Sequence, residues 1–289
     1  MDYYSKLEEY LLPEKVMDKM NFPRSTSEKG KAVLKNSNDK LYPGFPTKFL
    51  RICNLCKKKY RVAFNECQRS NEVCSFHPEK SIKKGQFYKC CGGSLNSPPC
   101  TNNPQHVHCH VDTDNLTGFI CTNEWESKKN IIALDCEMLY TDLGFEIAAI
   151  TVINEKCEVV LEKIVCPEGN IINYNTFHSS LSEKDFDGVT YKLEHLHNDM
   201  KKFIGKDTIL VGHGLENDLL RLKVIHDKIF DTCFVYPHPR GLPYRKRLDE
   251  LRSTYLKERN EDLNTNKLKC YKDAVDTVRL ALHKIGFVV

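Results

Sequence analysis

The sequence has no long apolar segment, and its longest apolar runs, such as residues 131–134, are far too short to cross a lipid bilayer. The chain begins Met1-Asp2-Tyr3-Tyr4 and soon becomes acidic, so no secretory signal is visible. Both absences argue against a membrane or secreted protein. We therefore expect a reducing compartment, the nucleus or alternatively the cytoplasm, and no membrane partner.

The sequence also has little net charge, because a formal value of +4 is only mildly basic and says little by itself about partners. Hydrophobic residues make up 40% and charged residues 28%, which is typical of a soluble globular protein. A length of 289 residues is long for one compact domain and comfortable for two. No internal repeat is visible.

Cysteine, in contrast, is abundant: the sequence has 14, and nine lie between Cys53 and Cys121, mixed with histidines. In a reducing compartment such a cluster indicates metal binding rather than a disulfide framework. The other five are scattered and are expected to pack as small apolar side chains. They are Cys136, Cys157, Cys166, Cys233 and Cys270.

Three segments follow one another along the chain. Residues 1–22 have helical apolar spacing that is broken at Pro13, and residues 24–40 have the composition of a flexible linker. We therefore predict an N-terminal extension and linker over 1–50, a Cys/His zinc-binding module over 51–125, and a larger domain over 129–289.

The larger domain has the pattern of an α/β fold. Short apolar stretches predict strands, and apolar residues at helical spacing predict helices. This mixture favours a mixed sheet flanked by helices. The predicted strands are 131–134, 146–153, 158–165 and 208–211, and the predicted helices are 191–204, 217–223, 248–255 and 274–283.

Four acidic residues stand at the boundaries of these predicted elements. Asp135 and Glu137 follow the first strand, and their spacing of two puts both side chains on one face. A lone D-x-E triplet is usually just an acidic strand end, and a lone acid near a helix start is favoured by the helix dipole. Asp218 and Asp273 follow in order, however, and this ordered set indicates ligands for hard divalent cations.

Several segments of residues 129–285 together resemble the Rex-type RNA exonucleases of the DEDD (RNase T-like) superfamily. The resemblance implies a ribonuclease H-like fold and 3′-to-5′ removal of nucleotides from RNA. It also implies that Asp135, Glu137, Asp218 and Asp273 hold two Mg²⁺ or Mn²⁺ ions, and that 129–289 is the exonuclease domain. The segments that carry it include Leu134-Asp135-Cys136-Glu137-Met138, Tyr174-Asn175-Thr176, Val211-Gly212-His213-Gly214-Leu215-Glu216-Asn217-Asp218 and Tyr236-Pro237-His238-Pro239-Arg240-Gly241-Leu242-Pro243-Tyr244.

One catalytic position departs from the family. The histidine type has its general base five residues before the last Asp, where this chain has Leu268. The sister type has a Tyr four residues before, and that position is Lys269. We therefore expect a slow enzyme. His213 is the foremost substitute base, although it fits a loop hydrogen bond better, and His178 and His226 are further candidates.

The Cys/His segment has spacing typical of tetrahedral zinc, because two ligands of a short C-x-x-C or C-x-x-H hook converge from one turn. The segment resembles the Cys/His-rich module ahead of some Rex-type exonuclease domains, and more distantly the CHORD module, which implies two structural Zn²⁺ ions. Whether the two quartets are sequential or interleaved stays open. The expected ligands are Cys53, Cys56, Cys74 and His77, followed by Cys90, Cys91, Cys100 and His106.

A basic run close to the acidic residues in sequence suggests contact with RNA phosphates, although such runs are usually just solvated surface. It includes Arg240, Arg245, Lys246 and Arg247. The function expected is a metal-dependent 3′-to-5′ exoribonuclease with RNA as its partner. The alternative, motivated by Leu268, is a non-catalytic RNA-binding protein on an exonuclease scaffold.

Overall fold

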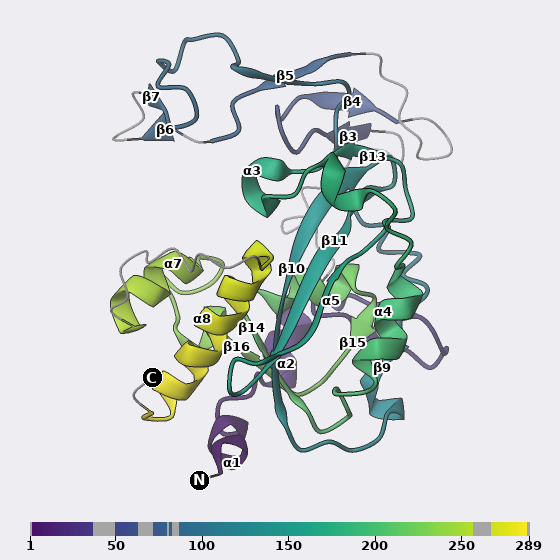
Figure 1. Ribbon diagram of the computed structural model, residues 1–289, viewed down its shortest axis with the longest axis vertical. Helices are drawn as coiled ribbons and strands as arrows, with labels where there is room; N and C mark the ends of the chain where they lie inside the picture. The colour runs from purple at the N-terminus through teal and green to yellow at the C-terminus, as the bar shows by residue number, and fades with distance from the viewer. Residues whose placement is uncertain are drawn as a thin grey trace.

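The centre of the computed structural model is a mixed β-sheet, and the structure describes residues 2–36, 50–62, 72–79, 81–82, 87–256 and 267–287. The strand order is β12-β11-β10-β14-β16, and β13 pairs with the far end of β10 (Figure 1). The strands are β10 (Ile131–Thr141), β11 (Gly144–Asn154), β12 (Val159–Ile164), β13 (Ile171–Asn173), β14 (Ile209–Gly212) and β16 (Ile229–Asp231).

The type of strand pairing changes once across this sheet. The pairs β12-β11 and β11-β10 are antiparallel, whereas β10-β14 and β14-β16 are parallel. Three antiparallel strands continued by two parallel ones, with helices on both faces, form a ribonuclease H-like arrangement. The predicted fold class is therefore confirmed.

Strand β10 is longer than the sequence pattern predicted. It continues through the D-x-E motif to Thr141, and a tight turn then leads to Gly144 at the start of β11. The register of the two strands shifts once, between Glu137 and Met138. Gly144 has a φ of +117°, which side chains rarely adopt. Asp135 and Glu137 consequently lie within a continuous central strand rather than at a strand end.

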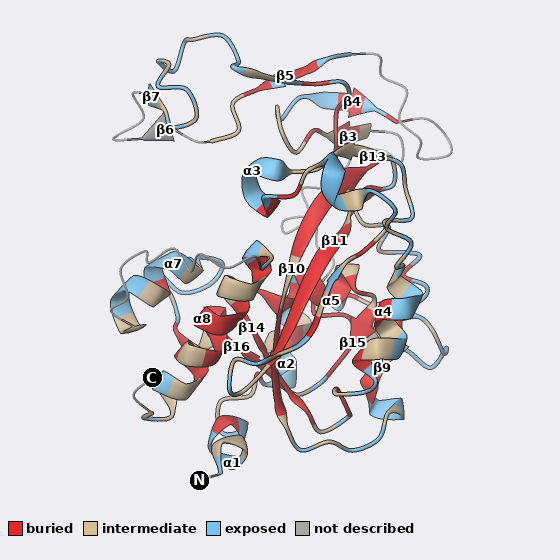
Figure 2. Cartoon of the chain, viewed as in Figure 1, coloured by how far each residue is buried: buried red, intermediate tan, exposed pale blue. Residues whose placement is uncertain are grey.

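Helices cover both faces of the sheet, and Figure 2 shows that β10 and β11 between them are almost wholly buried. One face packs against α1 (Tyr3–Glu8) and α8 (Lys269–Lys284), and the spacing of Ala274, Val275 and Val278 turns one side of α8 toward it. The other face packs against α2 (Glu14–Lys19), α4 (Leu193–Met200) and α5 (Leu215–Arg221).

The N-terminal residues belong to this core. Leu7 and Phe22 are fully buried, one on each side of the sheet, so the two predicted helices separated at Pro13 are confirmed as packed elements. The linker interpretation is wrong for residues 24–36, where β1 (Arg24–Ser25) pairs with β2 (Ala32–Val33) and Ala32 is buried. Residues 37–40 lie outside the described part of the chain.

The Cys/His segment forms a set of short hairpins beyond the end of β10 and β11, at the top of Figure 1. One more strand, β9 (Ile120–Cys121), pairs in parallel with β15 (Val224–Ile225) and joins the segment to the larger domain. The hairpin strands are β3 (Leu50–Ile52), β4 (Lys59–Arg61), β5 (Cys74–Phe76), β6 (Ser81–Ile82), β7 (Phe87–Tyr88) and β8 (Thr101–Asn103).

None of the helices in the described residues is long and apolar enough to span a membrane. The remaining helices are short. They are η1 (Thr122–Glu124), α3 (Thr176–Ser179), η2 (Glu183–Phe186), α6 (Thr232–Val235), α7 (Leu248–Leu251) and the π-helical η3 (Arg252–Leu256).

Candidate active site and metal clusters

The acidic pair of β10 lies at the centre of the molecule. Glu137 is buried, while Asp135 keeps partial exposure. Burial raises the pKa of Asp135 well above its usual range, and the nearby carboxylates of Asp218, Asp273 and Glu137 raise it further, in that order. Burial also raises the pKa of Glu137 to about 8. Asp135 therefore lies within electrostatic reach of the other three predicted acids.

Two helices bring the remaining acids to this strand. Asp218 comes from α5 and is buried, and burial followed by the charges of Glu216 and Asp231 raises its pKa well above the usual range. Asp273 is the fifth residue of α8, is partly exposed, and has a pKa raised by burial. The structure thus brings together four acids from three elements.

A loop before α5 determines where Asp218 lies. The carboxylate of Asp231 accepts hydrogen bonds from the backbone N–H groups of Gly214 at 3.0 Å, Leu215 at 2.8 Å and Cys233 at 2.9 Å. These bonds satisfy N–H groups at the starts of α5 and α6 that have no partner within their helices. The glycine-flanked segment predicted to lead to Asp218 is therefore a rigid turn.

Lys269 contributes a positive charge that the sequence pattern did not reveal as part of the site. It is the first residue of α8, and its charge lowers the pKa of Asp135, Glu137 and Asp273. Its ammonium donates a hydrogen bond to the carbonyl oxygen of His178 in α3. In the sequence, the one signal for a role of Lys269 in the site was its alignment with the Tyr of the sister type. Its single positive charge offsets only part of the negative charge of the four acids.

The four acids fit hard divalent cations. Carboxylate oxygens are the ligands that Mg²⁺ and Mn²⁺ prefer. Burial and like-charge repulsion raise the pKa values of these acids, and a nearby cation favours their charged forms. Within the described residues, no three of the four bring donor oxygens within 4.8 Å of one another, which is more open than the Cys/His clusters.

The expected position of the general base carries an apolar side chain that is packed away. Leu268 precedes α8 and contacts the cluster formed by Leu139 and Leu181. His213 has its Nδ1 2.8 Å from the Thr232 hydroxyl oxygen in a partly buried contact, and the charges that act on its pKa are those of Asp231, Arg245 and Asp249 rather than of the four acids. Its role as a loop hydrogen-bonding residue fits the structure instead.

Within the described residues, His178 is connected to the acids only through Lys269, whose ammonium donates to the His178 carbonyl oxygen. It lies on α3, and burial together with the charge of Lys269 lowers its pKa. His226, in contrast, is a fully enclosed structural residue whose ring nitrogens lie 2.6 Å from the Thr122 hydroxyl and 2.7 Å from the Thr208 carbonyl oxygen.

The basic run divides into partly buried and exposed members. Arg245 forms an ion pair of 2.5 Å with the buried Glu216, so its charge is engaged beside α5 rather than displayed on the surface. Arg240 and Lys246 lie over tyrosine rings, and Arg247 is exposed and paired with an acid two residues later. Arg240 and Arg247 are exposed, and these two have the freedom that phosphate contact needs.

The Cys/His residues form two compact clusters, and they are interleaved. One cluster contains Cys53, Cys56, Cys74 and His106, and the other contains His77, Cys90, Cys91 and Cys100. Within each cluster all donor atoms lie within 4.8 Å of one another. All eight predicted residues are used, and of the two arrangements that the sequence left open the structure has the interleaved one, with His106 in the first cluster and His77 in the second. Of the spare residues, Cys109, His108 and His110 join neither cluster, and Cys67 lies outside the described residues.

Strand pairing explains this arrangement. Strands β5 and β8 pair antiparallel, with Cys74 opposite Asn103, so the chain after β8 brings His106 back toward the Cys53 hook. The Cys53 and Cys74 sulfurs are 3.5 Å apart, and Cys56 Sγ is 3.3 Å from Nδ1 of His106. These spacings approach the ~3.8 Å expected between two sulfurs on tetrahedral zinc.

The two clusters differ in environment. The first is largely buried, and His106 stacks on Tyr60 with ring centroids 5.0 Å apart. The second is more exposed, and His77 stacks on Tyr88 at 3.6 Å. A hydrogen bond from Cys74 holds the pKa of Cys53 at about 4, which favours the thiolate, the form that binds metal.

Known proteins match this chain in sequence, although no family model does. RNA exonuclease 1 homolog of Homo sapiens is 32% identical over 98% of this chain and 24% of its own length. Exonuclease GOR of Pan troglodytes is 34% identical over 88% of this chain and 38% of its own. RNA exonuclease 3 of Eremothecium gossypii is 33% identical over 82% of this chain and 63% of its own. The chain thus spans less than two thirds of each of these relatives.

Among solved structures, the Pan2 catalytic unit of Neurospora crassa overlaps 81% of this chain and 45% of that chain at 15% identity, with a TM-score of 0.47. The class of protein is defined by this chain's own fold and site, a ribonuclease H-like sheet with four acids at its centre. Within that class, the sequence relatives confirm the resemblance, and the chain belongs to the Rex-type RNA exonucleases of the DEDD superfamily.

Proposed function

We propose that the chain is a metal-dependent exoribonuclease that removes nucleotides from RNA in the 3′-to-5′ direction. The observation that carries the proposal is the convergence of four carboxylates from β10, α5 and α8 around Asp135. Curated relatives named RNA exonuclease support the substrate class, and the Rex-type motifs imply the direction.

Asp135, Glu137, Asp218 and Asp273 would hold two Mg²⁺ or Mn²⁺ ions. Such a pair supplies an activated water, charge relief at phosphorus and support for the leaving oxygen. The protein positions these ligands on rigid elements, since Glu137 lies in the central strand and Asp218 follows the turn fixed by Asp231. Lys269, which donates to the His178 carbonyl oxygen, ties the start of α8 to α3 beside the acids.

Proton removal from the attacking water is the weak step. Leu268 offers no base, and His213 is engaged with Thr232. His178 is next to Lys269, and burial followed by the charge of Lys269 lowers the imidazole pKa, which favours the neutral form that can accept a proton. We therefore propose a slow enzyme in which His178 is the residue placed to substitute for the missing base.

We further propose that each Cys/His cluster holds one Zn²⁺ ion with a structural role. Four soft or imidazole donors in a closed set suit zinc, and closed four-ligand sites are structural rather than catalytic. The first cluster connects β3, β5 and the chain after β8, so metal bound there would hold the hairpins together.

A timed assay on RNA tests the proposal. RNA labelled at its 5′ end is incubated with the full chain and either Mg²⁺ or Mn²⁺. A ladder of progressively shorter labelled RNAs supports the proposal, provided that the labelled 5′ nucleotide is not released as a mononucleotide at early times. The second candidate, a non-catalytic RNA-binding protein, is favoured by the packing of Leu268 among leucines. A shifted but unshortened RNA at all times and pH values would establish that second function instead.

A further inference from the structure

The lysine at the start of α8 lies beside the predicted metal ligands. Lys269 is about one turn before Asp273 on α8, and residues four apart lie on the same side of a helix. The far end of its side chain reaches α3, where the ammonium donates a hydrogen bond to the carbonyl oxygen of His178. The side chain therefore connects the helix that carries one acid to a second helix.

The residues on both sides of Lys269 fix its backbone against the strands of the acidic pair. The sulfur of Cys270 lies 3.2 Å from the hydroxyl oxygen of Thr151, and Thr151 pairs with Asp135 across the sheet. Leu268, on the other side, packs in an apolar cluster formed largely by residues of β10 and β11. The start of α8 is thus held next to the strand that carries two of the acids.

Helix α3, which receives the ammonium, is attached to β10 beside Glu137. Asn175 is the residue before α3, and its side-chain amide donates to the carbonyl oxygen of Met138 at 3.2 Å. Met138 directly follows Glu137 in the strand. Lys269 therefore links two elements that both contact β10 next to its acids, and this places its charge at the acid site.

The positive charge of Lys269 acts on the acids themselves. Its hydrogen-bond acceptor is a neutral carbonyl oxygen, so this bond does not cancel the charge. The charge lowers the pKa values of Asp135, Glu137 and Asp273, which is the direction expected of a cation within electrostatic reach of all three. The electrostatics thus agree with the position that the hydrogen bonds and packing give to Lys269.

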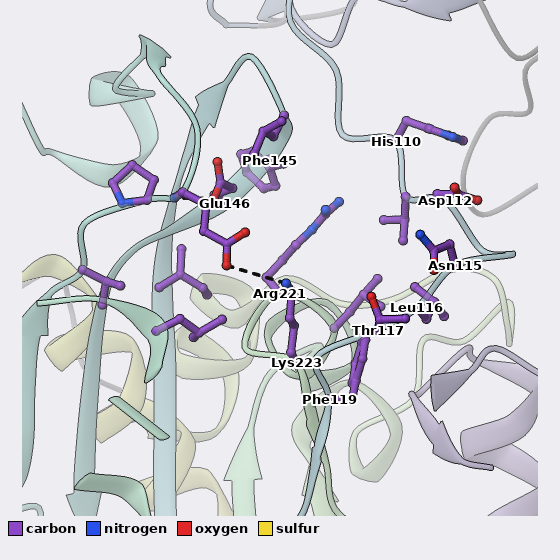
Figure 3. A pocket seen from close by; sticks show the side chains of 18 of the residues that line it. His110, Asp112, Asn115, Leu116, Thr117, Phe119, Phe145, Glu146, Arg221 and Lys223 are labelled. Atoms are coloured by element: carbon purple, nitrogen blue, oxygen red, sulfur yellow. Dashed lines mark hydrogen bonds and ion pairs between the residues drawn. The ribbon is translucent and has the colours of Figure 1, made fainter. Parts of the chain in front are cut away.

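Two other basic residues show the contrast, because each is paired with a carboxylate that is not among the four acids. Arg252 forms an ion pair with Asp276 of α8 at 3.1 Å. In the cavity shown in Figure 3, Lys223 forms an ion pair with Glu168 at 3.7 Å. Their charges are largely offset by these partners, whereas the charge of Lys269 is directed at the acid site.

The charge of the site determines how strongly it attracts divalent ions. When all four acids are ionised, four carboxylates and the Lys269 ammonium leave three net negative charges, and one bound divalent ion leaves one. Without the ammonium, the same two states would have four and two negative charges. Because Coulomb attraction is proportional to the charge that an ion meets, the second ion loses the larger share of its attraction.

We propose that Lys269 is a fixed counter-cation of the acid site that weakens the binding of divalent ions, the second ion in greater proportion than the first. The inference rests on the proposed function, because it concerns the same site. An ammonium has no lone pair to offer a metal, so Lys269 acts on the ligands through its charge. The protein would then hold one ion at metal concentrations that would fill both positions in a site without this lysine.

The test is a titration of the full chain with Mn²⁺ at pH 7, in which the EPR signal of the free ion reports how many ions bind and how tightly. Lys269→Gln and Lys269→Met remove the charge, and Lys269→Arg keeps it. Lys284→Gln is the matched control, because it removes the same charge about 22 Å further along the same helix, beyond the Debye length of about 8 Å. Asp218→Asn, which lacks a ligand of the acid site, reports ions bound elsewhere.

We expect Lys269→Gln and Lys269→Met to bind the second Mn²⁺ ion about tenfold more tightly than the wild type, and Lys269→Arg and Lys284→Gln to stay within about twofold of it. A side chain that only ties α8 to α3 would lower the melting temperature when removed, but it would not tighten metal binding. Unchanged or weaker binding by both neutral variants would overturn the inference. Equally tightened binding by Lys269→Arg would overturn it too, because the charge would not be the cause.

The titration measures no hydrolysis, so this inference and the proposed function can fail separately. Tighter Mn²⁺ binding by both neutral variants of a protein that never shortens RNA would refute the exonuclease and leave the role of Lys269 intact. Normal RNA shortening together with equal Mn²⁺ binding by wild type, Lys269→Gln and Lys269→Met would refute the role of Lys269 alone. If every variant bound only as much Mn²⁺ as Asp218→Asn, the metal site itself would be refuted, and both proposals with it.

Discussion

Single residues decide the chemistry, and the buried acid Asp218 shows how. Its folded-state pKa is raised, so the folded protein holds this proton more tightly than the unfolded chain does. Stability then decreases as the pH rises above the unfolded value of about 4 toward the folded value. A carboxylate that lowers stability in this way indicates a function, and for Asp218 the proposed function is metal ligation.

We predict that Asp218→Asn slows metal-dependent RNA cleavage at least about 100-fold, the scale of losing one preorganised electrostatic group. At pH 7, without added divalent cation, the same variant should melt at a higher temperature than the wild type, because the amide cannot ionise. Scanning calorimetry and a cleavage assay check the two effects. Asp114→Asn, at an exposed position, is the control and should change neither. Near-normal cleavage by Asp218→Asn would contradict the metal-ligand role.

The pKa of Glu137, raised to about 8 by burial, predicts a pH-dependent metal affinity. Below pH 8 a metal ion has to displace the proton, so apparent Mg²⁺ affinity should increase by up to about tenfold per pH unit from pH 6 and level off above about pH 8. Titration calorimetry across this range measures it, and Glu137→Gln should flatten the profile. A wild-type affinity that is constant between pH 6 and 8 contradicts the prediction.

Leu268 predicts a slow enzyme that works better at alkaline pH, because a positioned base typically contributes about 10²- to 10⁴-fold. Leu268→His should raise the rate near neutral pH. The gain should fall short of that full range, since the side chain packs toward Leu139 and Leu181. His178→Ala should lower the wild-type rate further. The cleavage rates of the three proteins are compared on one RNA across a pH series. A wild-type rate that is fast, independent of pH and unchanged by His178→Ala would contradict the prediction.

At the scale of elements, hairpin pairing determines which residues share a metal. The antiparallel β5-β8 pair carries His106 to the first cluster, while His77, next to β5 in sequence, belongs to the second. A sequential arrangement, which the sequence also allows, would group Cys53 with His77, so zinc content can distinguish the two arrangements.

The prediction concerns zinc content in double variants. With interleaved clusters, His77→Ala/Cys90→Ser damages one cluster and should retain one zinc per chain. Cys53→Ser/His77→Ala damages both clusters and should retain none. Sequential quartets would give the reverse pattern. Elemental analysis of purified protein distinguishes them, with wild type at two zinc per chain as the reference.

At the scale of the whole molecule, the N-terminal segment is a structural part of the exonuclease domain. Phe22 is fully buried among residues of the sheet, α4 and α5. We predict that Phe22→Ala lowers the free energy of unfolding by about 3–5 kcal/mol, the usual cost of removing a buried phenylalanine. Denaturant unfolding measures it. Phe177→Ala, at a site 52% exposed, is the matched control and should change it little. An effect of similar size in both variants would place Phe22 outside the core.

Much of the exonuclease fold could be predicted from local patterns. Residues 131–134 and 208–211 are short apolar runs that form β10 and β14, because strands buried on both faces need continuous apolar sequence. Strand β16 and the packing of residues 24–36 were not anticipated. Their short and weakly apolar sequences become buried only against distant partners such as Leu116 and Leu210.

The sequence by itself determined the residue types of the site: four acids in order, eight zinc-type ligands, and leucine where a base is expected. Tertiary structure decided which of them meet. The interleaving of the two Cys/His clusters and the position of Lys269 among the acids both depend on contacts between residues far apart in the chain. Local patterning constrains periodicity and burial, whereas side-chain partners across a fold depend on strand pairing and helix packing.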